Sequence, residues 1–328
     1  MRFHGLMAVR DEDDIIPQCL AHLLTWIDRL YVLDLGSKDS TWEMIRDAAS
    51  KDHRIVPFES QPYKYEDSIR WYLFEQYRSQ FHDGDWIVKI DGDEFYEVTP
   101  PKFVEERVQE PESIVYLGWY YFRLTSKEVA DYECGKVLAS EDRKRPIDQR
   151  RRYFKMPDYA EPRMFKYRHS MKWPSTRMHP YNAGYIARER IPIRHYPHRD
   201  PEQMGKRYRL RAAMLELPGE VGPPQWRLKD WRKDVLQIDE ATGTAMEQTH
   251  PSEGLSAAQG HTAGSLHFWK PGEDLPPITG TPHLSAWHRR AVQRLIYPNL
   301  VSLMDAWRSG RQPSYTPKLI SDEVQARL

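Results

Sequence analysis

The strongest constraint on the fold is an alternation of apolar runs and amphipathic stretches over the first hundred residues. Short apolar runs predict strands at Phe3–Val9, Leu30–Leu33, Ile55–Phe58 and Trp86–Ile90. The stretches between them have helical spacing or helix-starting residues, over residues 13–27, 40–49 and 68–81. Strands separated by helices of this length form βαβ units. The pattern therefore predicts an α/β, Rossmann-like fold with a mostly parallel sheet flanked by helices.

Two clusters of polar residues, 34–39 and 91–94, directly follow the second and fourth predicted strands. Because ligands of parallel sheets bind beyond the carboxyl ends of the strands, both clusters should converge at one edge. Asp91 and Asp93 form a D-x-D pair, whose carboxylates can reach one hard cation that neutralises a diphosphate. A lone D-x-D is more often a hydrophilic turn, so the residues alone leave both interpretations open.

The rest of the chain has a less regular pattern. Further helices are expected from Pro100 and at Pro201–Leu215, and further strands at Ser113–Phe122, Arg163–Tyr167 and Ile191–His195. Residues 123–162 are expected to be irregular.

The pattern also predicts how the chain is organised. A domain should cover residues 1–215 and consist of halves 1–97 and 98–215. Pro, Gly, Ser and Thr are frequent in residues 216–283, which predicts long loops. A helical extension should follow over residues 284–328, with its helix at 284–308.

Charge is balanced overall but segregated along the chain. There are 48 Lys+Arg and 48 Asp+Glu. Residues 1–100 hold 20 acidic and 11 basic residues, whereas residues 143–211 hold 20 basic and 6 acidic ones. Such segregation suggests docked lobes or a cleft, with ordinary surface variation as the alternative. The basic segment shows no zinc-finger, RNP or basic-zipper pattern, so we expect no nucleic-acid partner.

Several other classes are excluded by composition. No apolar run approaches the roughly 20 residues that span a bilayer. Cys19 and Cys134 are too few for a disulfide framework or a cysteine-based zinc site. The first residues lack the apolar core of a signal peptide, so we expect a cytoplasmic protein.

Three motifs occur in order, and they read V-R-D-E at residues 9–12, D-L-G-S-K-D-S-T at residues 34–41 and D-G-D-E-F at residues 91–95. Together they resemble the motifs of family-2 glycosyltransferases of the GT-A fold. Their order and spacing match the branch with V-R-N-E, D-x-G-S-x-D-x-T and D-x-D-E-F motifs, over about residues 3–97 and loosely to 215. The resemblance implies a metal-dependent transferase that moves a sugar from a nucleoside-diphosphate sugar, of the UDP or GDP type, to a hydroxyl acceptor. A glycan or lipid-linked glycan is the implied acceptor, in polysaccharide biosynthesis.

The resemblance also implies a role for each matching residue. The turn Val9, Arg10 and Asp11 would border the nucleotide, and Asp34 and Asp39 would belong to the nucleotide-sugar site, with Asp34 near the base. Asp91 would contact the ribose or a metal-bound water. Asp11 stands where the family usually has Asn, and Leu35 stands where it frequently has a second Asp. These two departures leave the base and sugar preference open.

A later segment resembles the histidine element of the same family. Residues 194–204 read R-H-Y-P-H-R-D-P-E-Q-M. By this resemblance Asp91, Asp93 and His195 would form the metal site, and two carboxylates with an imidazole suit Mn²⁺ better than Mg²⁺. Arg199 would pair with diphosphate oxygens. A capped strand-end histidine is the alternative for His195.

An inverting reaction by single displacement also needs a base for the acceptor hydroxyl. Asp142 is the first candidate, with Asp148 and Glu141 as alternatives; all three could instead be salt partners of nearby basic residues. Trp119 and His179 are candidates for acceptor contact, and a structural role is the alternative for each.

Other classes of function remain open at this point. The same motifs would occur in a non-catalytic nucleotide-sugar-binding protein, and a metal-dependent phosphohydrolase also uses D-x-D. The basic and aromatic helix expected from residue 284 could lie on an anionic membrane, which would place the protein at the inner face of a membrane. Plain docking onto the domain is the alternative.

Overall fold

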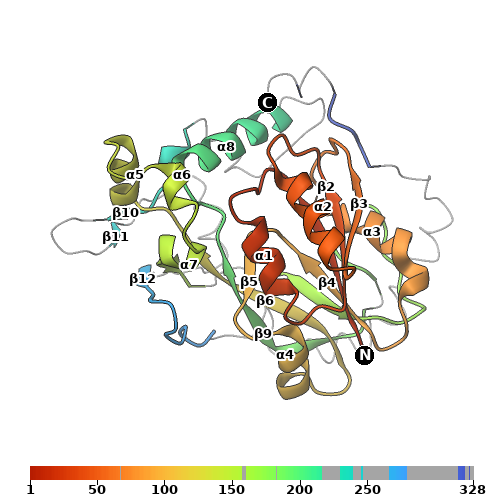
Figure 1. Ribbon diagram of the computed structural model, residues 1–328. Coiled ribbons are helices and arrows are strands. Elements are labelled where there is room, and N and C mark those ends of the chain that lie inside the picture. Colours follow the sequence, from red (N-terminus) through yellow and green to blue (C-terminus); the bar gives the residue numbers. More distant parts are fainter. Residues whose placement is uncertain are drawn as a thin grey trace. The chain divides into compact units, whose positions relative to one another are not determined.

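The computed structural model describes residues 1–66, 68–156, 160–181, 183–215, 230–238, 245–246, 266–278, 317–321 and 325 (Figure 1). The chain divides into two compact units. Unit 1 comprises Met1–Gly118, Ala160–Ile193 and Ile278–Leu319. Unit 2 comprises Trp119–Tyr159, Arg194–Pro277 and Ile320–Leu328. Two of the boundaries fall inside long strands, β6 (Glu112–Phe122) and β9 (Tyr185–His195), which both run from unit 1 into unit 2.

A parallel sheet forms the centre of unit 1. Its strands are β1 (Phe3–Val9), β2 (Arg29–Asp34), β3 (Ile55–Ser60) and β4 (Trp86–Ile90), in the spatial order β3-β2-β1-β4. Every residue of β1 is buried, as expected for a central strand covered on both faces. The register places Val9 beside Asp34 and Met7 beside Ile90, so the carboxyl ends of β1, β2 and β4 lie at one edge.

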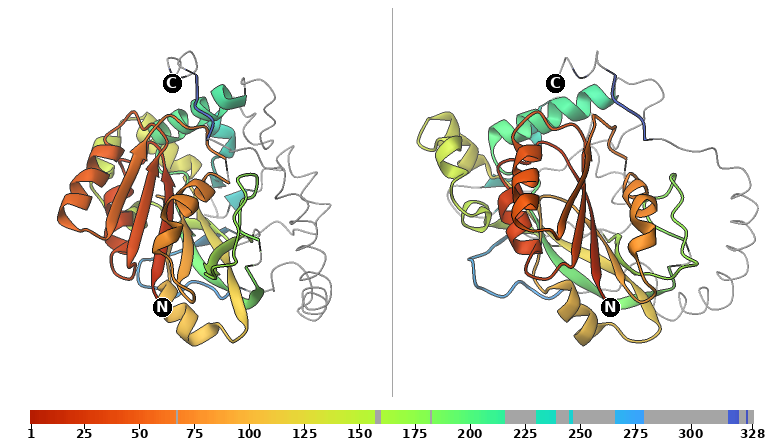
Figure 2. Two further views of the ribbon diagram at one scale, coloured as in Figure 1. Left: turned by 90° about the vertical axis from the view of Figure 1, so that its right-hand side faces the viewer. Right: turned by 45° about the vertical axis from the view of Figure 1, so that its right-hand side comes forward.

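Helices cover both faces of these strands. Figure 2 shows α1 (Ile16–Leu23) and α2 (Thr41–Lys51) on one face, and α3 (Arg70–Tyr77) on the other. A 3₁₀ turn, η1 (Arg78–Gln80), continues α3, so the helix predicted for 68–81 is shorter than expected. Pro17 lies in the first turn of α1, where a missing N–H costs nothing.

Unit 1 continues with antiparallel strands. Strand β8 (Pro162–Lys166) pairs with β4, and the first residues of β6 pair with β8. The short β5 (Glu94–Tyr96) pairs with β9, and α4 (Pro100–Arg107) begins at two prolines after Thr99. The predicted mixed α/β architecture is thus confirmed. The pairs β3-β2, β2-β1 and β1-β4 are parallel, whereas the described pairs β4-β8, β6-β8, β6-β7 and β7-β12 are antiparallel.

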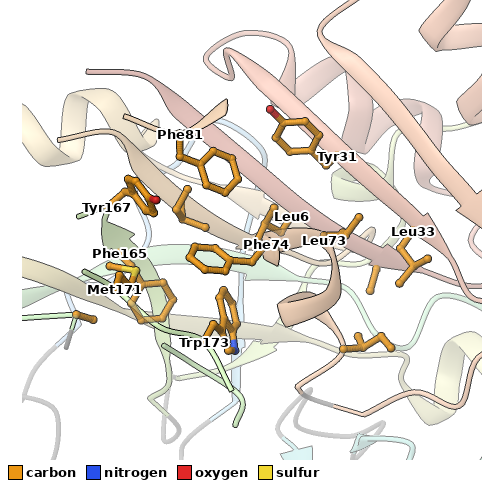
Figure 3. Packing of buried hydrophobic residues seen from close by; sticks show 14 of the residues in the cluster. Leu6, Tyr31, Leu33, Leu73, Phe74, Phe81, Phe165, Tyr167, Met171 and Trp173 are labelled. Atoms are coloured by element: carbon orange, nitrogen blue, oxygen red, sulfur yellow. The ribbon is translucent and has the colours of Figure 1, made fainter. Parts of the chain in front are cut away.

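An aromatic cluster packs α3 onto the sheet (Figure 3). The Phe74 ring is 5.5 Å from Trp173, 5.7 Å from Phe81 and 6.1 Å from Tyr167, between ring centroids. These partners come from the strand-end segments on either side of β4 and β8. Because aromatic side chains bury a large apolar area, this cluster fixes α3 against the sheet.

Unit 2 holds its own small core. Helix α5 (Ser126–Glu133) starts with a capping box, in which Thr125 and Glu128 satisfy each other's backbone N–H groups. Val129 of α5 packs with Met204 and Tyr208 of α8 (Pro201–Leu215), and with Leu124 and Val235. Strand β7 (Tyr153–Lys155) pairs with the end of β6 and with β12 (Leu266–Phe268).

Residues 123–162 are more regular than the sequence predicted, and that expectation was wrong. They contain α5, α6 (Ala139–Asp142), α7 (Ile147–Arg150) and β7. The charged residues that suggested irregular structure form ion pairs with one another, which lets short charged helices pack.

The C-terminal third is described only in part. Within the predicted loop-rich segment, the described residues form η3 (Trp231–Asp234), β10 (Gln237–Ile238), β11 (Ala245–Met246) and β12. The helix predicted for 284–308 lies outside the described residues. None of the helices in the described part of the chain has the length and apolar character needed to cross a membrane.

Replacing Phe74 by alanine should destabilise unit 1 by about 3–5 kcal/mol, because the ring leaves a cavity that the surrounding aromatic residues cannot fill. Urea denaturation followed by fluorescence would measure the loss. Glu75→Ala on the same helix is the matched control, since the exposed Glu75 side chain pairs with Arg78 alone among the described residues, and it should change stability by less than about 0.5 kcal/mol. Equal effects of the two changes would contradict this packing.

Candidate functional site

The order of the parallel strands defines where unit 1 can bind a ligand. The chain moves from β1 to β2 to β3 in one direction, then returns through α3 to β4 on the other side of β1. The direction of the strand order therefore reverses between β1 and β4, whose following loops lie at the same edge of the sheet. In open α/β sheets this switch point is the usual ligand-binding crevice. Arg10, Asp11, Asp91 and Asp93 lie in these two loops.

The two predicted polar clusters do converge at this edge. A side-chain carbon added to Gly92 would lie 3.3 Å from Val9 and 3.5 Å from Glu12 and Ile16, so the turn after β4 packs on the segment after β1. The loop after β2 is bound to the same segment, because the backbone N–H of Asp11 donates to the Ser37 hydroxyl at 3.0 Å.

Asp34 organises the turn after β2 rather than facing outward. Its side chain is fully buried. Its carboxylate accepts hydrogen bonds from the backbone N–H groups of Gly36 and Ser37, at 3.1 and 3.0 Å. It also accepts from the hydroxyls of Ser37 and Ser60, both at 2.5 Å. Gly36 has a φ of 78°, which a residue with a side chain rarely adopts, and this explains the D-x-G-S pattern.

Asp39 ties the loops after β1 and β2 together. Its carboxylate accepts from the Thr41 N–H and hydroxyl, at 2.9 and 2.5 Å, and from the Asp13 N–H at 3.2 Å. Thr41 in turn accepts from the Glu12 N–H at 2.7 Å. The second half of the D-x-G-S-x-D-x-T motif therefore holds the β1 loop in place.

Asp11 adopts the left-handed region, with a φ of 53°. Asp and Asn are the non-glycine residues that most readily occupy this region. Its carboxylate accepts from the Lys38 N–H at 2.7 Å. The replacement of Asn by Asp in V-R-D-E thus preserves the backbone turn that the motif requires.

Arg10 carries the most informative atoms of the site. Its side chain is 6% exposed, and its Nε donates to Asp11 at 3.4 Å. The two terminal guanidinium nitrogens are buried and find no hydrogen-bond acceptor among the described residues. A buried cationic donor without an acceptor is costly, so this position favours the approach of an anion.

Asp91 is held by two arginines that the motif analysis did not include. Arg70 of α3 donates to one carboxylate oxygen and to the Ile90 carbonyl. Arg163 of β8 donates to the other oxygen at 3.2 Å. Burial by itself would raise the pKa of Asp91, but Arg70 and Arg163 outweigh it and hold the pKa below its ordinary value.

The same arginine belongs to a wider buried network. Arg163 also pairs with Glu94 at 2.7 Å and with Glu161 at 3.3 Å, and Glu161 accepts from Lys89 at 2.9 Å. Burial raises the pKa of Glu94 well above its usual range, and Arg163 opposes this only in part. Burial works against the charge of Glu161 as well, yet Arg163 and Lys89 lower its pKa to about 2.

The predicted metal ligands are divided between the two units. Asp93 is 4% exposed and belongs to unit 1 with Asp91, whereas His195 belongs to unit 2. Among the described residues, no group of three or more His, Cys, Asp or Glu side chains is arranged to hold a metal ion. Because both oxygens of Asp91 accept from guanidinium groups, unit 1 by itself does not fit a metal centre that uses Asp91 as a direct ligand.

His195 lies among aromatic rings in unit 2. Its ring centroid is 4.6 Å from that of Trp119 and 5.0 Å from that of Tyr121. The structure therefore brings together the predicted metal ligand and one predicted acceptor residue, both at the unit 2 ends of long strands. His179 lies in unit 1 instead, where its ring stacks on Phe165 and its Nδ1 lies 3.2 Å from the Pro180 carbonyl.

Arg199 is fully buried in unit 2. Its guanidinium donates to the Tyr196 carbonyl at 3.2 Å, and its backbone N–H donates to Gln203. These bonds fix the bend between β9 and α8. Arg199 therefore has a structural role in addition to the diphosphate contact that was predicted for it.

The three predicted base candidates have different surroundings. Asp142 is 5% exposed and forms ion pairs with Arg145, Arg150 and Arg151. Burial would raise its pKa, but Tyr132 and these arginines lower it. Glu141 is exposed and bonded to Lys144, whereas Asp148 is half-buried, with its nearest cation, Arg194, at 3.8 Å.

The residues that the motifs missed are Arg70, Arg163, Lys89 and Glu161. A signal for them is present in the sequence, because Lys89 and Arg163 are charged residues inside apolar strands. Such charges are almost always paired when buried. On that basis Lys89 and Arg163 could have been predicted to pair with buried carboxylates.

Comparison with known proteins gives limited likenesses. No protein-family model matches the chain. A TPR repeat-containing protein of Synechococcus elongatus is 29% identical over 113 residues. The match covers 34% of this chain and 25% of that protein, so the chain spans well under half of its relative's length.

Glycosyltransferases are among the solved structures that resemble the chain, at low TM-scores. A mannosyltransferase from Pyrobaculum calidifontis, solved with GDP-mannose and Mn²⁺, has a TM-score of 0.30 and 14% identity over 35% of each chain. Glucosyl-3-phosphoglycerate synthase from Mycobacterium tuberculosis, solved with phosphoglyceric acid, has a TM-score of 0.21 and 22% identity. That match covers 37% of this chain and 44% of the synthase.

The network around Glu161 predicts a specific pH dependence of stability. The folded-state pKa of Glu161 lies below its unfolded value, so its charge stabilises the fold above the unfolded pKa, and this stability is lost as pH falls toward about 2. The Glu161→Gln variant should therefore be less stable than the unchanged protein at pH 7. The difference in unfolding free energy between the two proteins should become smaller by roughly 2 kcal/mol as the pH falls from 5 to 3.

Urea unfolding of both proteins across this range is the measurement. Glu75→Gln, on an exposed helix face, is the control and should show no such convergence. If the difference in unfolding free energy between Glu161→Gln and the unchanged protein stays constant from pH 7 to pH 3, the buried ion pairs are contradicted.

Proposed function

We propose that the chain is a glycosyltransferase that uses a nucleoside-diphosphate sugar as donor and a hydroxyl group as acceptor. The observation that carries the proposal is the buried Arg10 guanidinium, whose terminal nitrogens have no acceptor among the described residues. It lies at the switch point of the sheet, next to the D-x-G-S turn. The motif resemblance suggests the chemical class, and the guanidinium nitrogens without an acceptor support anion binding by Arg10.

Arg10 suits a diphosphate for two reasons. A guanidinium presents parallel N–H donors that match two phosphate oxygens. Its charge is already held in place by burial and by the Asp11 contact, so little side-chain entropy is lost when the anion arrives. Arg10 therefore binds the diphosphate in this proposal, and the turn of Val9 and Asp11 borders the rest of the nucleotide.

Asp34 and Asp39 act indirectly in this scheme. Asp34 has no exposed surface, so its carboxylate shapes the turn and does not contact the base itself. In this proposal the main chain of that turn borders the base. Asp39 holds the β1 loop through Thr41 and Asp13. Asp91, whose side chain is 25% exposed, accepts from the ribose while its two arginines fix the carboxylate.

A divalent metal, Mn²⁺ or Mg²⁺, belongs to the proposal through Asp93. When bound, such an ion neutralises charge on the diphosphate as it leaves. Asp93 is the proposed carboxylate ligand, with Asp91 acting through water and His195 as the imidazole ligand. The arginine contacts of Asp91 argue against a direct bond from that residue.

The acceptor side needs a base that takes the hydroxyl proton. Asp142 fits poorly, because a carboxylate with a lowered pKa and three arginine partners is a weak proton acceptor. Asp148 accepts no hydrogen bond among the described residues, and we propose it as the base. Trp119, half-buried against His195, is the proposed acceptor platform.

Replacing Arg10 by methionine should weaken binding of UDP or GDP, in the presence of Mn²⁺, by about tenfold or more, because a charge-assisted bond to phosphate is lost. Isothermal titration would measure the change. Methionine fills similar space without charge, so the ligand-free variant should melt at the same temperature as the unchanged protein or higher. Arg46→Ala, on the exposed face of α2, is the control and should bind equally well.

A structural arginine would behave in the opposite way. If Arg10→Met lowers the melting temperature while leaving nucleotide affinity unchanged, the diphosphate assignment is wrong.

The choice of base gives a second prediction. Asp148→Asn should lower kcat by about a hundredfold or more with little change in KM for the donor, since only proton transfer is affected. Asp142→Asn should instead lower the melting temperature, because it leaves buried arginines without a full counter-charge. Steady-state kinetics and thermal melting of both variants separate the roles. Full activity of Asp148→Asn would exclude it as the base.

A further inference from the structure

A cavity of about 310 Å³ lies within unit 2, and no residue assigned to the nucleotide lines it. Its walls come from α5, α6, α7, β7 and β12, of which α5, α6, α7 and β12 are labelled on the left of Figure 1. Pockets of this size accommodate small molecules. None of the motifs accounts for the cavity, although Asp142 lies in its wall.

One wall of the cavity is a closed ion network. The Asp142 carboxylate accepts from the Tyr132 hydroxyl at 2.5 Å, from Arg150 at 3.0 Å and from Arg145 at 3.0 Å. Arg151 donates to the Tyr132 hydroxyl at 2.5 Å and pairs with Glu128 at 3.3 Å. These bonds hold the side chains of this wall in place, and the two carboxylates offset most of the charge of its three arginines.

The remaining cations of the cavity have no such balance. Lys127 and Arg152 line the cavity, and neither has a carboxylate partner among the described residues. Of the acidic residues in the lining, Asp131 is bonded to Lys136, which lies outside it. The described lining therefore carries an excess of positive charge that a bound anion would offset.

An aromatic surface completes the cavity. Arg152 lies over the Phe268 ring, 5.1 Å from its centroid, and Phe268 contacts Tyr153 edge-on at 5.0 Å. Phe268 is 45% exposed, so its ring is accessible to a ligand in the cavity. A ligand with a carbon skeleton next to its anionic group would cover this ring.

We propose that this cavity binds the phosphate group of a phosphorylated small molecule or lipid headgroup. Arg152 and Lys127 donate to the phosphate oxygens, half-exposed Arg145 adds a third cation, and Phe268 packs against the carbon skeleton of the ligand. The Asp142 network holds Arg145 and Arg151 in place. No residue of the proposed donor site lines this cavity, so the phosphate site can be tested independently of the proposed transferase activity.

The test is a titration of the full chain with glycerol 3-phosphate and with inorganic phosphate, measured by calorimetry without nucleotide or metal. Glycerol 3-phosphate should bind more tightly, because it adds the aromatic contact. The double variant Lys127→Ala, Arg152→Ala should weaken binding by about tenfold or more, since two charge-assisted donors are lost. Both side chains are exposed, so the variant should keep its melting temperature.

Lys144→Ala is the matched control. Lys144 is an exposed lysine of the same unit that pairs with Glu141 and does not line the cavity. It should leave the affinity for glycerol 3-phosphate within about twofold of the unchanged protein. Equal weakening by the control, or no weakening by the double variant, would overturn the proposal.

Sedimentation with vesicles separates the two sources of phosphate. If the protein sediments with phosphatidic acid vesicles and not with phosphatidylcholine vesicles, the pocket binds a lipid headgroup. Retention must then be lost in the double variant. Binding of glycerol 3-phosphate without retention would assign it to a soluble ligand. Failure to bind phosphatidic acid vesicles, glycerol 3-phosphate or inorganic phosphate at up to about 10 mM would overturn the proposal.

Discussion

The ion network that joins Asp91 to Arg70 and Arg163 is the interaction on which unit 1 depends. It links α3, the end of β4 and strand β8 through the partly buried carboxylate of Asp91. Taking these charges out of water is expensive, and only their close pairing offsets the cost. The network therefore fixes the D-x-D turn in one conformation. It also explains why the first carboxylate of that turn is a poor direct metal ligand while remaining a good hydrogen-bond acceptor.

The switch point between β1 and β4 gives this network its functional position. The D-x-G-S turn and the Asp39–Thr41 contacts hold the β1 loop against the β4 turn. Arg10 is thereby kept buried, and its two terminal nitrogens have no acceptor among the described residues. Burying guanidinium donors without an acceptor costs free energy, which a bound anion would offset, and a diphosphate is the anion that the adjoining motifs indicate.

The sequence predicted the parallel half of the sheet well because that half follows simple rules. Phe3–Val9 and Trp86–Ile90 are apolar runs of strand length, and both are strands with the same bounds in the structure. Helix Pro201–Leu215 was also predicted with its observed bounds, since Pro201 and the following charged residues mark its start. The convergence of the clusters after β2 and β4 followed from strand direction alone.

Residues 123–162 could not be predicted in the same way. Their helices are short and charged, and they are stabilised by contacts such as Arg143–Asp200 that join distant parts of the chain. The roles of Arg70 and Arg163 were missed for a related reason. Local patterns show that a charge is present in an apolar segment, but the identity of its partner is set by the fold.

Release of nucleoside diphosphate is the measurement that tests the central claim most directly. The full chain would be incubated with UDP- and GDP-sugars, Mn²⁺ and hydroxyl acceptors, beside the Asp93→Asn variant. The account predicts acceptor-stimulated release by the unchanged protein and its loss in the variant. Nucleotide binding without release under every acceptor condition, or equal release by Asp93→Asn, would contradict it.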